Sequence, residues 1–162
     1  MYVSRGLRRT LLEALRRFPA VLVTGPRQSG KTTFLLHEVG RAFDYVTFDD
    51  PLERSFAAAD PNGFLDRFTD KPLILDEIQY VPELLPYLKI RIDRDRKRHG
   101  KWLMTGSQQF QLMKNVSESL AGRIAILELL PFSISETRRR RPPSLEQTVW
   151  NGGYPEPSLH PR

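Results

Sequence analysis

The segment from Gly25 to Thr32 constrains the fold more than any other part of this 162-residue sequence. It reads Gly-Pro-Arg-Gln-Ser-Gly-Lys-Thr, which matches a loop pattern of two spaced glycines followed by lysine and a hydroxyl residue. An apolar run over residues 20–24 precedes the loop, and a helical pattern begins at Lys31. This strand–loop–helix context predicts that N–H groups of the loop and of the helix N-terminus bind the phosphates of a nucleotide.

Side chains of the same loop are expected to complete the phosphate site. Lys31 is predicted to neutralise the β and γ phosphates, and the Thr32 hydroxyl to join the coordination shell of Mg²⁺, which prefers hard oxygen ligands. Whether Arg27 contacts phosphate or lies exposed stays open. The alternative to the whole interpretation is an ordinary glycine turn with an exposed lysine. The residues expected to contact the nucleotide are Gly25, Pro26, Arg27, Gln28, Ser29, Gly30, Lys31, Thr32 and Thr33.

Two carboxylates follow a second apolar run. Asp76 and Glu77 come directly after residues 72–75, which predict a buried strand. Because parallel strands deliver their carboxyl ends to one edge of a sheet, Asp76 is predicted to hold Mg²⁺ together with Thr32. Glu77 is predicted to polarise a water molecule for attack on the γ-phosphate. A solvated acidic strand end is the alternative.

Two further candidates lie beside later strands. Ser107 follows the apolar run at 102–105, where its hydroxyl can bond the γ-phosphate or the attacking water, and Gln108 is a weaker candidate. A turn or helix cap is the alternative for Ser107. Arg123 precedes the run at 124–129, where a guanidinium either stabilises the γ-phosphate of a neighbouring subunit or forms a salt bridge within the chain.

Apolar runs alternate with helical patterns along the chain. Leucines at every fourth position from Leu7 to Leu15, for example, predict an amphipathic helix over residues 5–17. Such alternation implies right-handed crossovers and a parallel sheet with helices on both faces, so we predict one α/β domain of three layers, αβα. The predicted strands are 20–24, 45–49, 72–75, 102–105 and 124–129, and the predicted helices are 5–17, 31–39, a segment opened by 50–51, 64–68 and 84–92.

The formal net charge of +6 raises the question of a nucleic-acid partner. Basic residues concentrate at 89–101 and at 138–141, and solvated faces are the alternative to a nucleic-acid footprint. No apolar run approaches the ~20 residues needed to span a bilayer, and the first residues lack a secretory signal. A cytoplasmic protein without a membrane partner is therefore expected. The three histidines are scattered, and the chain has no cysteine, so no zinc site is predicted.

Several segments in a fixed order resemble the AAA-type ATPase domain of a large family of bacterial and archaeal ATP-binding proteins. The likeness covers roughly residues 5–157. It implies a P-loop ATPase fold with a five-stranded parallel sheet of order 5-1-4-3-2, and ATP with Mg²⁺ as the bound group. It also implies a sensor role for Ser107 and an arginine-finger role for Arg123, which requires at least a dimer. The shared segments are the P-loop, FDDP (48–51), LILDE (73–77), DEIQ (76–79), LMTGSQ (103–108), SLAGR (119–123) and LLPFS (129–133).

Members of this family carry a long C-terminal domain of largely uncharacterised function after the ATPase domain. Its opening resembles residues 150–157 here. We therefore expect a fragment with three parts: an ATPase domain over residues 1–135, a basic and proline-containing linker over 136–149, and the truncated start of a C-terminal domain over 150–162.

The leading functional hypothesis is an ATP hydrolase whose nucleotide cycle drives or switches an attached or partner module. One alternative is a nucleotide-dependent binding switch with negligible turnover, and another is a nucleic-acid-associated ATPase. A small-molecule kinase is disfavoured by the Asp76–Glu77 pair. ATP is preferred to GTP because of the resemblance and because the sequence has no Asn-Lys-x-Asp motif for reading guanine.

Overall fold

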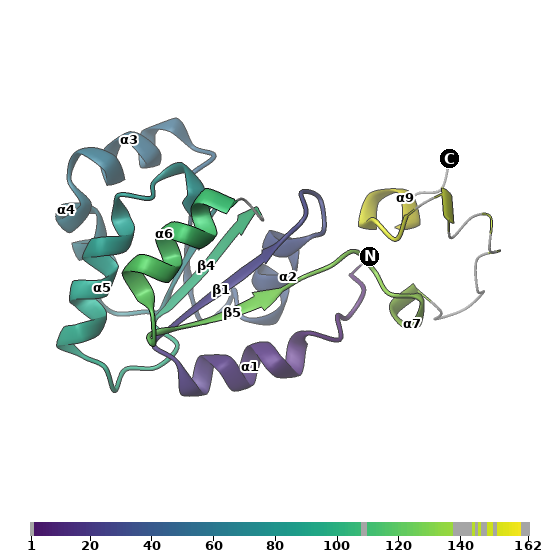
Figure 1. Cartoon of the computed structure of the whole chain (residues 1–162), viewed down its shortest axis with the longest axis horizontal. Coiled ribbons are helices and arrows are strands. Elements are labelled where there is room, and N and C mark those ends of the chain that lie inside the picture. Colours follow the sequence, from purple (N-terminus) through teal and green to yellow (C-terminus); the bar gives the residue numbers. More distant parts are fainter. Residues whose placement is uncertain are drawn as a thin grey trace.

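The computed structural model describes residues 2–107, 110–137, 144, 146, 149, 150 and 152–159 of the chain. Within these residues, strands alternate with helices (Figure 1). The strands are β1 (Ala20–Gly25), β2 (Asp44–Thr47), β3 (Leu73–Asp76), β4 (Trp102–Ser107) and β5 (Ile124–Glu128). The helices are α1 (Arg8–Arg17), α2 (Lys31–Glu38), α3 (Pro51–Ala59), α4 (Pro61–Asp66), the 3-10 helix η1 (Ile78–Tyr80), α5 (Leu84–Arg94), α6 (Phe110–Leu120), α7 (Ile134–Thr137) and α9 (Pro155–Leu159).

The strands form one parallel sheet of order β2-β3-β4-β1-β5. This is the expected order 5-1-4-3-2 read from the opposite edge, so the predicted topology is confirmed. Strands β1, β3 and β4 are buried at every position, as parallel strands covered on both faces should be. Edge strand β5 is partly exposed along its length. The carboxyl ends of the strands therefore meet at one edge, and their amino ends at the other.

Helices cover both faces of this sheet. On one face, α1 and α2 bury Leu11 and Phe34. On the other face, α4, α5 and α6 bury Phe64, Leu88 and Val116. Figure 1 shows α3 to α6 gathered on one side of the strands and α1 on the other. The predicted three-layer αβα architecture is thus confirmed.

Several helices differ from the sequence prediction, among them α1, α4 and α6. Helix α1 begins at Arg8 rather than Arg5, because the Arg5 guanidinium turns inward and donates to the Ser29 carbonyl oxygen at 3.0 Å. Helix α6 was not predicted from the sequence, although its residues Leu112 and Val116 are buried at helical spacing. In the described ranges, no helix combines the length and the apolar character needed to cross a membrane.

The first predicted domain boundary, after residue 135, falls inside α7. Glu136 of α7 accepts hydrogen bonds from the Arg5 side chain and from the Gly6 N–H, so α7 is tied to the N-terminal segment. The Phe132 N–H donates to the Gly153 carbonyl at 2.6 Å, which ties the segment before α9 to the chain that follows β5. The basic run 138–141 lies outside the described residues. The division into three parts stays a prediction.

Candidate functional site

The glycine-rich loop joins β1 to α2 at the carboxyl edge of the sheet (Figure 1). Gly25 has a φ of +145°, and a Cβ atom there would lie 2.3 Å from the Leu129 carbonyl oxygen. Gly30, the residue before α2, has a φ of +87°. Both conformations favour glycine. The two glycines thus let the loop curl, so that the first N–H groups of α2, which lack partners within the helix, point out of its N-terminus.

Lys31 lies inside the curled loop. Its side chain is almost fully buried, and its ammonium group donates to the carbonyl oxygens of Gly25 at 3.2 Å and Pro26 at 2.9 Å. Burial lowers the pKa of Lys31, while Glu77 and Asp76 act in the opposite direction. The ammonium group is thus held among neutral carbonyl groups, where an anion would be a stronger partner.

Asp76 at the end of β3 meets Thr32 at the start of α2. The Thr32 hydroxyl donates to the Asp76 carboxylate at 2.9 Å, and the Tyr45 hydroxyl donates to its other oxygen, also at 2.9 Å. Thr105 of β4 donates a third hydrogen bond to this carboxylate. Asp76 is only 3% exposed, and in the part of the chain that the structure describes it forms no salt bridge. A buried carboxylate bonded only to hydroxyl groups suits a hard cation, and one carboxylate beside one hydroxyl suits Mg²⁺, which keeps several waters.

Glu77 stands next to Asp76 in a left-handed conformation, with a φ of 59°. The Glu77 N–H donates to the Thr105 hydroxyl at 3.0 Å, and the Gln79 amide donates to the Glu77 carboxylate. Glu77 lines a hollow of about 150 Å³ together with Lys31 and Thr32. The structure therefore brings the predicted lysine, hydroxyl and carboxylate groups of two strand ends to one place.

Two serine hydroxyls near the loop are buried without a hydrogen-bond partner in the described structure. Ser107 pairs with Gly25 in the register of β4 and β1, which places it beside the first residue of the loop. Ser29 lies within the loop itself. A buried hydroxyl without a partner loses the hydrogen bonds that water would give it, so the two serines have capacity to bind a polar ligand.

The family comparison fits this geometry. The AAA domain family matches residues 17–138, which is most of the chain. The chain belongs to the AAA domain family. AAA domains generally bind ATP with Mg²⁺, and the chain is thus an AAA-family P-loop ATPase domain, as the resemblance in its sequence implied.

Among curated proteins, this AAA domain is similar to two mycobacterial proteins. The uncharacterized proteins Mb2031c of Mycobacterium bovis and Rv2008c of Mycobacterium tuberculosis are each 35% identical to it, over 89% of this chain and 36% of theirs. The chain therefore spans about a third of the length of these relatives.

Solved structures show the same fold at low sequence identity. The Walker-type ATPase of Pyrococcus abyssi aligns with a TM-score of 0.59 at 19% identity, over 84% of this chain and 56% of that one. The RuvB Holliday junction branch migration motor of Thermotoga maritima aligns with a TM-score of 0.52 at 19% identity, over 83% of this chain and 48% of that one. Orc1 of Aeropyrum pernix, solved in complex with DNA, aligns with a TM-score of 0.51 at 18% identity, over 85% of this chain and 48% of that one.

Other predicted site residues lie at the margin of the AAA domain site or away from it. Arg27 lies exposed on the loop, and Thr33 is exposed on α2 beside the hollow. Arg123 lies at the amino edge of the sheet, opposite the P-loop, where it binds the Asp93 carboxylate at 2.8 Å. The salt bridge within the chain is thus formed, and an arginine finger toward a neighbouring subunit stays a prediction. Gln108 lies outside the described residues.

Four side chains of the AAA domain site were not predicted from the sequence. Tyr45 and Thr105 bind Asp76, and Gln79 binds Glu77. Arg5 binds the loop through the Ser29 carbonyl. The DEIQ segment offered a signal for Gln79, and the strand end LMTGSQ offered one for Thr105. Tyr45 and Arg5 gave no signal, because each meets the site through a contact between distant segments.

A second hollow adjoins the loop on the side of the N-terminal segment. It measures about 420 Å³, and Gly30 and Thr33 line it as they line the first hollow. Its remaining wall includes Tyr2, Pro155 and Leu159. The AAA domain thus has a wider and more apolar space next to its phosphate loop, closed in part by α9.

Proposed function

We propose that this AAA domain binds Mg²⁺–ATP in its P-loop and hydrolyses it to drive or switch an attached or partner module. The observation that carries the proposal is the contact between Thr32 and Asp76, 2.9 Å apart, beside a hollow that Thr32, Lys31 and Glu77 line. A loop that only turned the chain would not need a buried lysine, a buried aspartate and a glutamate at one point.

Each of these side chains has a defined task in the proposal. The Lys31 ammonium leaves the loop carbonyls to bind β and γ phosphate oxygens, and Thr32 and Asp76 are the residues that hold Mg²⁺. Bound Mg²⁺ supplies charge neutralisation between the phosphates. Glu77 accepts a proton from the water that attacks the γ-phosphate, and Gln79 keeps its carboxylate in position. Ser107 offers its free hydroxyl to the γ-phosphate, as a sensor of the bound nucleotide.

The base and ribose are assigned to the hollow beside the loop. Its volume of about 420 Å³ suits a nucleoside, and it begins at Gly30 and Thr33, where the triphosphate would end. Tyr2 and Leu159 give it apolar walls. Because α9 and the N-terminal segment both line this hollow, nucleotide exchange would change the contacts of α9. This arrangement supports a role in switching an attached module.

Phosphate release by wild-type protein and by a Glu77→Gln variant tests the proposal. Glutamine keeps the size of the side chain and its place beside Gln79 but cannot accept a proton. We expect turnover to fall at least about a hundredfold while the affinity for ATP is retained. Glu118→Gln, at an exposed position of α6, is the matched control and should leave both quantities unchanged. Equal phosphate release by wild type and Glu77→Gln would refute the assignment of Glu77.

The binding switch with negligible turnover uses the same residues. It predicts ATP affinity that depends on Lys31, together with phosphate release at the same low rate in wild type and Glu77→Gln. The two candidates thus separate in one pair of assays.

A nucleic-acid-associated ATPase is a further candidate. The concentration of cations between Lys89 and Lys101 favours it. Two solved structures of the same fold, a Holliday junction branch migration motor and Orc1 in complex with DNA, are in keeping with it. The arginine finger proposed for Arg123 would act in an oligomer, and size-exclusion chromatography with and without ATP measures that state.

A further inference from the structure

The amino edge of the sheet, opposite the P-loop, holds most of the net charge of the chain. Residues 89–101 contain seven lysines and arginines against two aspartates, which gives +5 of the formal +6. They cover the end of α5 and the turn that leads into β4. Cations at a helix C-terminus interact favourably with its dipole, which accounts for Arg91 and Arg94 but not for those beyond the helix.

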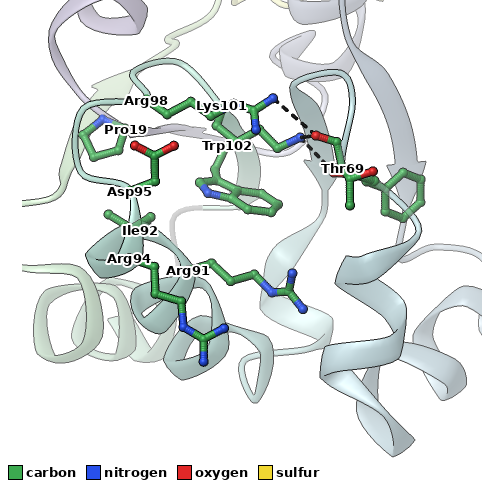
Figure 2. A pocket seen from close by; sticks show the side chains of 10 residues that line it. Pro19, Thr69, Arg91, Ile92, Arg94, Asp95, Arg98, Lys101 and Trp102 are labelled. Atoms are coloured by element: carbon green, nitrogen blue, oxygen red, sulfur yellow. Dashed lines mark hydrogen bonds between the residues drawn. The ribbon is translucent and has the colours of Figure 1, made fainter.

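These cations line a hollow rather than an open face. It measures about 220 Å³, and Arg91, Arg94, Arg98 and Lys101 line it. In Figure 2, Arg91 and Arg94 extend from α5 on one side of the Trp102 ring, and Arg98 and Lys101 lie on the other. Asp95 is the single carboxylate among the described residues of the lining, so the wall carries an excess of positive charge.

Lys101 is a fixed part of the wall of this hollow. It is 6% exposed, and its ammonium group donates to the carbonyl oxygens of Phe68 at 2.8 Å, Thr69 at 3.2 Å and Lys71. Burial lowers the pKa of Lys101, and the Arg98 charge acts in the same direction. The three protons of Lys101 are thus used for structure, and its charge adds to the potential of the hollow without a carboxylate in contact.

Three arginines keep donors for a ligand. The Arg94 guanidinium has no hydrogen-bond or ion-pair partner in the described part of the chain. Arg91 uses one terminal nitrogen on the Asn62 carbonyl and the Asp66 carboxylate, which leaves its other terminal nitrogen for a ligand, whereas its Nε is buried. Arg98 uses one nitrogen on two backbone carbonyls. Planar guanidinium groups with free donors match the oxygens of phosphate.

A neighbouring basic hollow lies next to the one that Arg94 lines, along the amino edge of the sheet. It shares Pro19 and Ile92 with the first and measures about 340 Å³. Arg17, Arg96 and Arg123 line it. Arg96 and Arg123 share the single carboxylate of Asp93, so positive charge remains there too. Two adjoining basic hollows form a track, which suits a polymer with phosphates at regular intervals better than one small anion.

We propose that this track at the amino edge, centred on Arg91, Arg94 and Arg98, binds the phosphodiester backbone of a nucleic acid. The site is separate from the P-loop, and its occupation does not depend on ATP binding. Trp102 is nearly buried and is not available to stack on a base, and the proposal assigns the arginines to phosphates. The interaction is therefore expected to depend on salt and not on sequence.

Anisotropy of a labelled duplex of about 20 base pairs, titrated with the protein at several salt concentrations, tests the site. Three phosphate contacts predict that affinity falls about 40-fold between about 50 and 200 mM salt. Arg94→Ala should lower this ratio to about 12-fold, and Arg94→Ala with Arg98→Ala to about 4-fold. Arg94 has no hydrogen-bond or ion-pair partner to lose in the described structure, so its replacement should lower the unfolding midpoint only slightly, through its interaction with the helix dipole.

Two controls separate the track from other causes. Arg9→Ala removes another exposed helical arginine, at the far end of α1, and should leave the ratio unchanged. Lys31→Ala removes the P-loop cation and should also leave it unchanged, so the track and the ATP site can fail independently.

Inorganic tripolyphosphate and poly-glutamate are titrated against the Lys31→Ala protein as competitors. Absence of duplex binding at about 50 mM salt, equal ratios in Arg94→Ala and Arg9→Ala, or displacement by either competitor at equal charge would overturn the proposal.

Discussion

Arg5 ties the P-loop to the chain that follows β5, and its replacement by methionine measures the strength of that tie. The Arg5 side chain is 4% exposed. It donates to the carbonyl oxygens of Ser29 at 3.0 Å and of Leu130, forms an ion pair with Glu136 at 3.2 Å, and lies 4.6 Å from the centre of the Phe132 ring. Methionine keeps the apolar stem and removes the donors and the charge.

The expected loss follows from these contacts. Removing one partner of a buried ion pair costs about 3–5 kcal/mol, and Glu136 is partly reached by solvent, so the lower value applies to the pair. The Ser29 and Leu130 carbonyls can turn toward water at the loop surface. We therefore expect the free energy of unfolding to fall by about 3 kcal/mol, which is about 1.5 M in the urea midpoint for a slope near 2 kcal/mol per M.

Urea unfolding followed by circular dichroism measures this difference, with Arg9→Met as the matched control. Arg9 is exposed, and among the described residues its ion pair is with Glu13 on the same helix, so its loss should stay below about 0.5 kcal/mol. The reasoning is refuted if Arg5→Met and Arg9→Met unfold at the same midpoint.

The ion pair between Arg5 and Glu136 also makes the stability of the protein depend on pH. Burial raises the pKa of Glu136, but the N–H groups of Gly6 and Ser133 and the Arg5 guanidinium outweigh burial and hold this pKa below its usual 4.5. A lowered acid pKa gives stability that is present above pH 4.5 and lost as the pH falls through the lower, folded value. Arg5→Met should therefore lose part of the acid dependence of wild type.

Three further predictions concern the P-loop itself. Burial lowers the pKa of Lys31, so ATP affinity should fall as the pH rises through a value below the usual 10.5 of lysine. Lys31→Arg should retain its affinity at that pH, and equal losses of affinity in wild type and variant in equilibrium binding would contradict this. Thr32→Val should raise the Mg²⁺ concentration for half-maximal nucleotide binding about tenfold, whereas Thr32→Ser should not, and a Mg²⁺ titration that cannot tell the two apart would rule out the ligand role. Gln79→Leu should slow phosphate release at least about tenfold at unchanged ATP affinity, and a loss of affinity instead would give Gln79 a different role.

The parts of the fold that sequence patterns predicted are those set by local chemistry. Strands β1, β3 and β4 are short, apolar and bounded by turn residues, so their positions were predicted closely. The loop from Gly25 to Gly30 depends on local sequence, because its two glycines adopt positive φ values that favour glycine. Once parallel strands were inferred, the meeting of Asp76 with Thr32 followed from topology.

The parts that were not predicted depend on contacts between distant segments. Arg5 contacts the loop 24 positions later, and Tyr45 contacts Asp76 31 positions later. The left-handed backbone of Glu77 comes from the packing of η1 against β4, since its N–H is held by Thr105. The sequence around Arg123 did not show whether its partner lies in the same chain or in a neighbouring subunit. Its contact with Asp93 depends on the folded structure.

Equilibrium titration with a fluorescent ATP analogue in the presence of Mg²⁺, for wild type beside Lys31→Ala, tests the central claim most directly. The Lys31 ammonium lies buried inside the curled loop, so wild type should bind saturably and the variant should lose most of its affinity. Circular dichroism of both proteins shows whether the variant remains folded. Saturable binding by wild type that is lost in a folded Lys31→Ala protein is the predicted result. Equal affinity in the two folded proteins, or no binding by wild type, would contradict the account.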